Sequence, residues 1–173
     1  MSTLPTANDL FAYLDGTHRE IDAKVRRLNQ LVQDVAHRTL NASECLELKR
    51  ICEFFGTDAR NHHLDEERHV FPALLSSDSE DVVTAAKRLT QDHGWLEENW
   101  IEISPHLAAI SQGSGTYDLA ELSHGMEVFG ALYDEHMHLE ESLAYPAAQK
   151  SKHLIDVLGA GREMAQRRWA KPN

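Results

Sequence analysis

Residues 61–74 read NHHLDEERHVFPAL, and residues 134–147 carry a near copy, DEHMHLEESLAYPA. Each copy contains a histidine and a glutamate four residues apart, a spacing that places both side chains on one face of an α-helix. Imidazoles and carboxylates are ligands that iron, manganese and zinc accept in proteins. The repeated pairs therefore predict a site for two metal ions inside a helical bundle. The pairs are His62–Glu66 and His136–Glu140, which a shift of 74 residues superposes.

The segments around these two copies show the hydrophobic periodicity of long helices. Four long helices are expected, separated by short polar breaks, and a shorter helix follows them. Short breaks require each helix to run antiparallel to the one before it. The sequence thus predicts an all-α fold, an up-down-up-down antiparallel four-helix bundle with a short C-terminal helix. The expected helices span about residues 8–37, 44–75, 79–112, 117–150 and 152–169.

Two single residues indicate where one of these helices begins and where another bends. Ser43 is the expected N-cap of the second helix, because a serine side chain can accept a hydrogen bond from the first free backbone N–H groups. Pro105 should bend the third helix without ending it.

The apolar positions of these helices repeat as the motif does. The inward positions of the second helix recur in the fourth at a shift of 74 residues, and those of the first recur in the third at a shift of 75. The chain is therefore expected to consist of two copies of one αα-hairpin packed face to face. No linker divides the copies, so we expect one domain over residues 1–173. The bundle would occupy about residues 8–150 and a C-terminal extension residues 151–173.

Six polar side chains interrupt stripes that are otherwise mostly apolar. Burying carboxylates and imidazoles in a bundle core is very costly unless something pairs them, and a metal ion does so. The four histidines, one from each helix, also fall at one height in an up-down-up-down bundle, given a rise of ~1.5 Å per residue. The predicted metal ligands are His18, His62, Glu66, His93, His136 and Glu140.

Other interpretations of these residues stay open. His63 and Glu67 also stand four residues apart, about 100° around the helix from the inward stripe, so a small error in helical phase would make them the ligands. A lone core histidine such as His18 or His93 is more often hydrogen-bonded than ligating, and a lone His-x-x-x-Glu is common on solvated helices. The repetition, in phase with four stripes, favours the metal site.

The composition narrows the partners and the compartment. The net charge of −11 argues against nucleic acid and anionic membrane surfaces. No apolar run approaches the ~18 residues of a membrane span, and the N-terminus lacks a secretory signal, so a cytoplasmic protein is expected. Cys45 and Cys52 lie too far apart on one predicted helix to form a disulfide, and we expect reduced core thiols.

The full pattern, H…HxxxE…H…HxxxE, resembles that of the hemerythrin family, specifically the bacterial hemerythrin-like proteins with an HHE cation-binding domain. The segments HHLDEERHVFP and HMHLEESLAYP are similar to the family's HHxxEExxxFP form, and the resemblance covers about residues 8–150. It implies a non-haem di-iron centre, with two iron ions bridged by an oxo or hydroxo group and by Glu66 and Glu140. The four histidines would be terminal ligands.

The same resemblance implies a protein that binds or senses oxygen or a related small ligand, such as nitric oxide or peroxide. It leaves alternatives: a di-iron enzyme with peroxidase-like, catalase-like or nitric oxide-handling activity, and a role in iron-centre repair or iron storage.

One position departs from the oxygen carriers of the family. They carry a further histidine four residues after the third-helix histidine, where this chain has Glu97. Glu97 is a candidate additional ligand. If it coordinates a metal ion, the ligand set becomes richer in hard oxygen donors, which weakens the case for a reversible oxygen carrier. Glu97 would otherwise close the open coordination position or face solvent.

Overall fold

The structure, a computed structural model, describes residues 7–151 and 155–169, and helices make up nearly all of this part of the chain. Within these residues there is no strand, so the predicted all-α class is confirmed. The elements are α1 (Ala7–Val35), α2 (Ala42–Phe54), the π-helical turn η1 (Phe55–Ala59), α3 (Arg60–His69), α4 (Phe71–Leu75), α5 (Glu80–Ser111), α6 (Leu119–Leu139), the π-helical turn η2 (Glu140–Ala144), α7 (Tyr145–Lys150) and α8 (Val157–Trp169).

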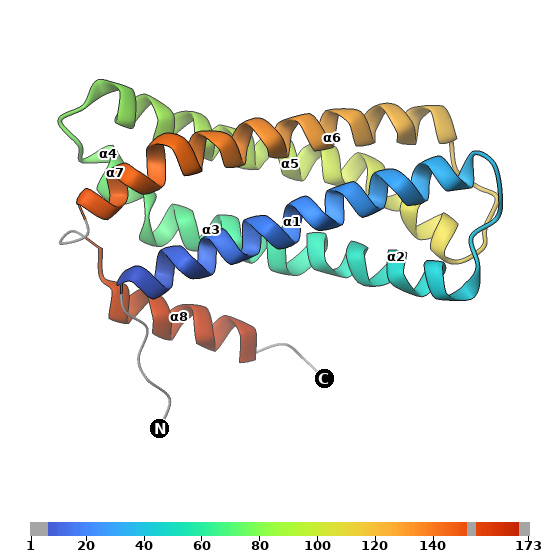
Figure 1. Ribbon diagram of the computed structural model, residues 1–173, viewed down its shortest axis with the longest axis horizontal. Helices are drawn as coiled ribbons and strands as arrows, with labels where there is room; N and C mark the ends of the chain where they lie inside the picture. The colour runs from blue at the N-terminus through green and yellow to red at the C-terminus, as the bar shows by residue number, and fades with distance from the viewer. Residues whose placement is uncertain (1–6, 152–154, 170–173) are drawn as a thin grey trace.

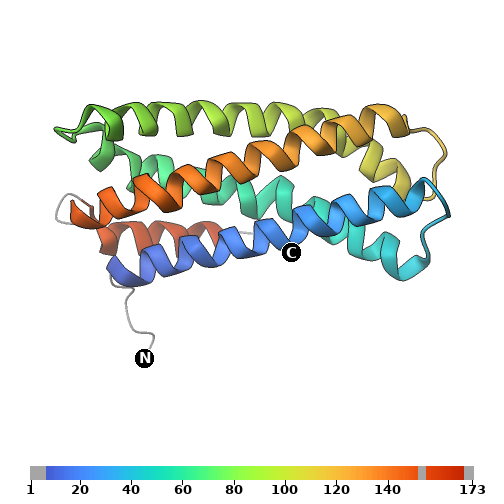
Figure 2. The ribbon, with the colours of Figure 1, turned by 45° about the horizontal axis from the view of Figure 1, so that its top comes forward.

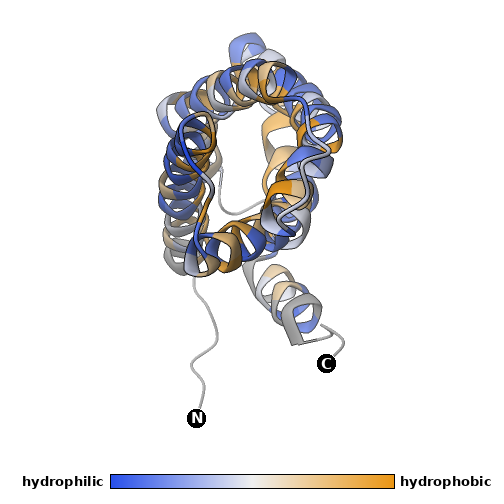
Figure 3. Ribbon diagram, turned by 90° about the vertical axis from the view of Figure 1, so that its right-hand side faces the viewer, coloured by the Kyte–Doolittle hydropathy of each residue, from blue (hydrophilic) through white to orange (hydrophobic). Residues whose placement is uncertain are grey.

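Four long rods form the body of the molecule, because α2 to α4 follow one another in one rod and α6 to α7 in another. Figure 1 shows successive rods running in opposite directions, with the connections at the two ends. Viewed from the end, the rods form a ring whose hydrophobic faces turn inward, and α8 lies outside it (Figure 3). Of the predicted C-terminal helix, residues 152–154 lie outside the described part of the chain.

The ends and bends of the rods follow local side-chain chemistry. Asn41, not Ser43, caps α2: its side chain accepts hydrogen bonds from the backbone N–H groups of Ser43 and Glu44, and the Glu44 carboxylate accepts from the Asn41 N–H. This reciprocal arrangement satisfies two groups at once, which Ser43 cannot do from inside the helix. Helix α5 continues through Pro105 to Ser111 and bends over its last turns (Figure 2).

The core is divided into two apolar clusters with a polar layer between them. One cluster fills the end near α2 and includes Leu28, Phe55 and Phe129. The other fills the end near α4, α7 and α8, and includes Leu14 and Phe71. In each rod the predicted ligands lie between the residues of the two clusters along the sequence, so the polar layer crosses the bundle at one level.

The two π-helical turns explain where the predicted stripes lose phase. A π-helical turn holds one more residue than an α-helical turn, so the residues beyond it are rotated around the rod. Leu143 and Ala147, which continue the spacing of His136 and Glu140 in a regular α-helix, are only half-buried, whereas Ala144 at the end of η2 and Tyr145 and Ala148 beyond it are buried. Before η1, Ile51 is buried in place of Cys52, which is a half-buried free thiol like Cys45. Within the described residues, no helix is both long enough and apolar enough to cross a membrane.

Candidate metal centre

The polar layer brings together all six predicted ligands. All of them are buried, and they form two groups of four whose potential ligand atoms lie within 4.8 Å of one another. Both groups contain Glu66 and Glu140. We call the group completed by His18 and His62 the first half of the centre, and the group completed by His93 and His136 the second half.

Each shared carboxylate offers one oxygen to each half. Glu66 faces His62 through Oε1, at 3.4 Å from Nε2, and His93 through Oε2, also at 3.4 Å from Nε2. Glu140 faces His18 through Oε2, at 3.0 Å, and His136 through Oε1, at 3.3 Å. A carboxylate placed in this way can reach two cations at once. The arrangement can therefore hold two cations and link them through both glutamates.

Buried atoms without hydrogen-bond partners show that the group fits a cation. Both ring nitrogens of His62, the Oε2 atom of Glu66 and both carboxylate oxygens of Glu140 are buried and accept or donate no hydrogen bond. Unpaired buried polar atoms are costly and rare in folded proteins, because nothing replaces the water they lose. A donor set of four imidazoles and two carboxylates suits iron, manganese or zinc.

The protonation states within the layer also suit metal ligation. Burial lowers the pKa of His62 to about 3 and lowers that of His136, so both rings are neutral near pH 7. Burial raises the pKa of Glu140 well above its usual range, and repulsion from Glu66 adds to the effect. The two carboxylates therefore do not both ionise easily without cations between them.

Two further glutamates orient histidines of the centre. Glu67 Oε1 lies 2.7 Å from His93 Nδ1, and Glu141 Oε1 lies 3.0 Å from His18 Nδ1. A carboxylate that accepts the Nδ1–H proton fixes the tautomer and leaves Nε2 free for a metal. In the case of His93, burial lowers the pKa, but hydrogen bonds to Glu66 and Glu67 outweigh it, and the pKa is raised. This role was not predicted from the sequence, although the doubled glutamate in both copies of the motif, Glu66–Glu67 and Glu140–Glu141, was a signal for it.

The aromatic residues beside the halves differ by a hydroxyl group. Phe71 stacks on His93 in the second half, with ring centroids 5.6 Å apart, and Tyr145 stacks on His18 in the first, at 5.4 Å. The Tyr145 hydroxyl lies 3.1 Å from His18 Nε2 and donates a hydrogen bond to Glu66 Oε1. The Tyr145 hydroxyl therefore touches His18 Nε2 and the Glu66 oxygen that faces His62, whereas Phe71 brings no such group to the second half.

His63 and Glu67, the alternative ligand pair, contact the second half of the centre in two different ways. Glu67 bonds to His93 as described above, whereas His63 stacks almost parallel on His93, with centroids 4.1 Å apart and planes at 13°. His63 also meets His136 edge-on at 5.6 Å. It forms a third group with these two histidines, so it belongs to the surroundings of the second half.

Glu97 lies outside both groups of four. Its side chain is 45% exposed, and Oε1 lies 2.5 Å from Nη2 of Arg60. Glu97 is therefore a surface residue in an ion pair with Arg60, and it does not join the six candidate ligands.

Comparison with known proteins gives two matches. The family model described as the hemerythrin HHE cation binding domain matches residues 9–148. A protein from Haemophilus influenzae, described as uncharacterized, is 27% identical over 167 residues, which cover 96% of this chain and 94% of that protein. The family match contains all six residues of the centre.

Proposed function

This chain belongs to the hemerythrin HHE cation-binding family, and from that premise we propose that it is a non-haem di-iron protein that binds or senses oxygen or a related small ligand, such as nitric oxide or peroxide. The observation that carries the proposal is the sharing of Glu66 and Glu140 between two groups of four ligands. His18 and His62 would hold one iron ion, and His93 and His136 the other. When bound, the iron pair supplies electrons to the incoming ligand.

The chain's own residues supply position and protection. Glu67 and Glu141 hold the rings of His93 and His18, so little reorganisation is needed on metal binding. The apolar clusters on both sides of the polar layer separate it from bulk water along the bundle axis. A dry site limits side reactions of a reduced centre.

A second candidate function is catalytic, with turnover of peroxide or nitric oxide. Turnover requires a proton source beside the centre, and the Tyr145 hydroxyl bonds directly to Glu66. Simple reversible binding requires no such group. Tyr145 is therefore the observation that favours an enzyme.

The experiment is metal analysis and absorption spectroscopy of the anaerobically purified protein, followed by stopped-flow mixing with oxygen. We expect two iron ions per chain. One ion per chain would defeat the di-iron proposal. A stable oxygenated spectrum would support reversible binding, whereas irreversible oxidation together with iron-dependent consumption of peroxide or nitric oxide would support the enzyme.

A further inference from the structure

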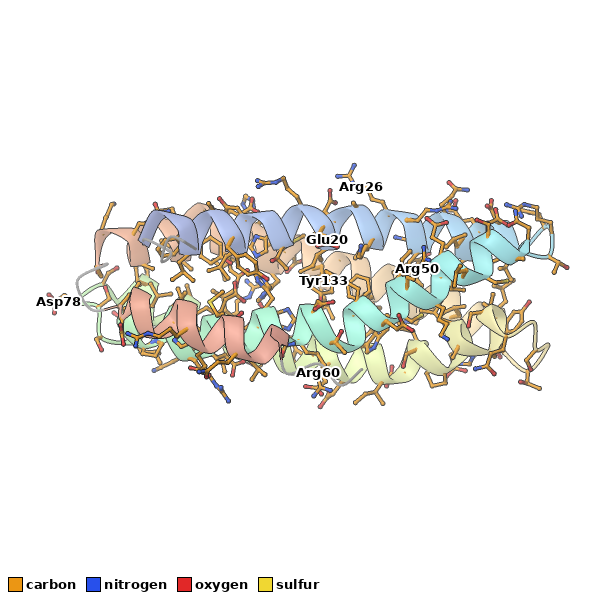
Figure 4. The ribbon with its side chains drawn as sticks, turned by 90° about the horizontal axis from the view of Figure 1, so that it is seen from below. Glu20, Arg26, Arg50, Arg60, Asp78 and Tyr133 are labelled. Carbon is orange, nitrogen blue, oxygen red and sulfur yellow. The ribbon has the colours of Figure 1, made fainter. Side chains whose placement is uncertain are left out.

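A cavity of about 490 Å³ opens beside the second half of the centre. It lies between the rod that contains η1 and α3 and helix α5, with α6 behind it. Figure 4 shows Tyr133 inside the bundle and Arg60 on its outer side. Its wall combines aromatic, aliphatic and polar side chains, and among them are Phe55, Trp100, Phe129, Tyr133, His63 and His93.

The cavity serves one half only, since neither His18 nor His62 lines it. Two glycines in its wall, Gly56 and Gly94, have open space where a Cβ atom would stand. In the other copy of the repeat the position of Gly94 is occupied by Arg19. The equivalent of Gly56 is Gly130, whose Cβ position lies 3.6 Å from a side-chain carbon of Val25. The open wall thus lies between the first copy, which contains Gly56, and the second copy, which contains Gly94, and the equivalent positions between α6 and α1 are Gly130 and Arg19.

His63 is placed to contact a molecule in this cavity, not to ligate a metal. A metal ion lies in the plane of the imidazole that binds it, and the stacked rings of His63 and His93 lie in separate, nearly parallel planes. His63 Nε2 is buried and has no hydrogen-bond partner. A ring nitrogen of His63 nevertheless lies within 4.8 Å of ring nitrogens of His93 and His136. The unpartnered Nε2 leaves His63 able to hydrogen-bond to a molecule in the cavity that this ring lines.

The size and charge of the cavity restrict its occupant. Its volume far exceeds the ~30 Å³ of one water molecule and falls within the roughly 300–1,000 Å³ of pockets that bind organic ligands. At the mouth, Arg60 and Glu97 neutralise each other. Within the cavity, Glu67 is paired with His93 and the Thr90 hydroxyl donates to a backbone carbonyl, whereas Nε2 of His63 has no hydrogen-bond partner. An uncharged molecule with an apolar body and one polar head fits this description.

We propose that the cavity binds an organic molecule with an aryl or alkyl body and a hydroxyl or hydroperoxide head, and that His63 hydrogen-bonds to this head. The inference rests on the proposed function, because it directs the head towards the second half of the metal centre. It extends that function from small inorganic ligands to organic hydroperoxides and their alcohols.

The test uses zinc-loaded protein, which is diamagnetic and redox-inert, with cumyl alcohol as the probe. Zinc is accepted by the same donor set. We expect saturable binding by calorimetry. In NMR spectra, the indole N–H signal of Trp100 should shift, while that of Trp95, exposed on the same helix, should stay in place. The result is independent of iron and oxygen, so its failure differs from failure of the proposed function.

Three variants make the test specific. Gly56→Leu fills the cavity and should abolish binding, whereas Gly16→Leu, on α1 and away from the cavity, should not change it. His63→Phe keeps the stacked ring but removes the hydrogen bond, and should weaken binding about five- to tenfold. Circular dichroism checks that each variant is folded.

Absence of saturable binding to the unmodified protein would overturn the proposal. Equal shifts of the two tryptophans, or full affinity in a folded Gly56→Leu protein, would also overturn it, because the molecule would then bind elsewhere. Full affinity in His63→Phe would overturn the role of His63.

Discussion

The two halves of the metal centre share one plan and differ in their surroundings. Each combines two histidines with the same two carboxylates, and in each a neighbouring glutamate holds one ring. Around the first half, Tyr145 brings a hydroxyl to the ligands, and the repeat places Met137 where the second half has His63. The second half faces a cavity. The residues that are the same in both copies thus form the candidate metal-ligand set. The residues that differ between the copies give each half different hydrogen-bonding groups and a different access to solvent.

The largest effect on metal content is expected from removing a carboxylate that both halves share. Glu66→Ala should reduce metal content from two ions to less than one per chain, because both halves lose an oxygen ligand. His62→Ala or His136→Ala, by contrast, should leave about one ion, in the half that is untouched. Metal analysis after dialysis checks this. Equal metal content in all three variants would show that the halves are not separate sites.

Loss of the outer glutamates should have a smaller, half-specific effect. Glu67→Gln should weaken metal binding in the second half, and Glu141→Gln in the first, by about 10–100-fold each, because the ring loses its acceptor. Competition with a chelator measures the two affinities, and Glu127→Gln, exposed on α6, is the control. A similar loss of both ions in either variant would contradict the assignment.

Tyr145→Phe makes the first half resemble the second, where Phe71 occupies the equivalent position. The variant should lower the free energy of unfolding by about 1–3 kcal/mol, since Glu66 loses a buried hydrogen bond. Urea unfolding of the metal-loaded protein measures it. If turnover of peroxide is found, the variant should slow it while metal content stays at two ions. An unchanged rate would exclude Tyr145 as the proton donor.

The smallest effect on metal binding is expected from a substitution far from both halves of the centre. Asn41→Ala removes the cap of α2 and should lower the free energy of unfolding by about 1 kcal/mol without changing metal content. Loss of an ion would show that either half empties whenever the bundle is weakened.

The same cap gives a pH dependence. The hydrogen bond from Arg38, with one from the Asn41 N–H, lowers the pKa of Glu44 to about 2. This pKa in the folded protein is below the ordinary glutamate value of 4.5, so the ionised carboxylate stabilises the fold above about pH 4.5. The contribution is lost as pH falls towards 2, and acid unfolding of Glu44→Gln should lack it.

The sequence predicted six candidate ligands that the bundle does bring together, because their spacing and helical phase are local properties. Within rods of regular α-helix, residues such as Ile21 and Leu89 are buried as the stripes require. The phase was lost at Cys52, just before η1, and from Leu143, within η2, because an inserted residue in a helical turn has no periodic signature. The roles of Glu141 and Tyr145 depend on contacts across more than 120 positions of sequence, and those follow only from the packed bundle.

The sharing of carboxylates has a consequence for how such a protein could arise. The hairpin of α1 to α4 contributes His18, His62 and Glu66 to the first half, and needs Glu140 from the other hairpin to complete it. The second hairpin depends on Glu66 in the same way. Neither hairpin alone provides all four ligands of one half. Two identical hairpins related by a two-fold axis would each provide the glutamate that the other lacks. In one continuous chain that exchange is kept and the symmetry is no longer required, so that the first copy can carry His63 where the second carries Met137.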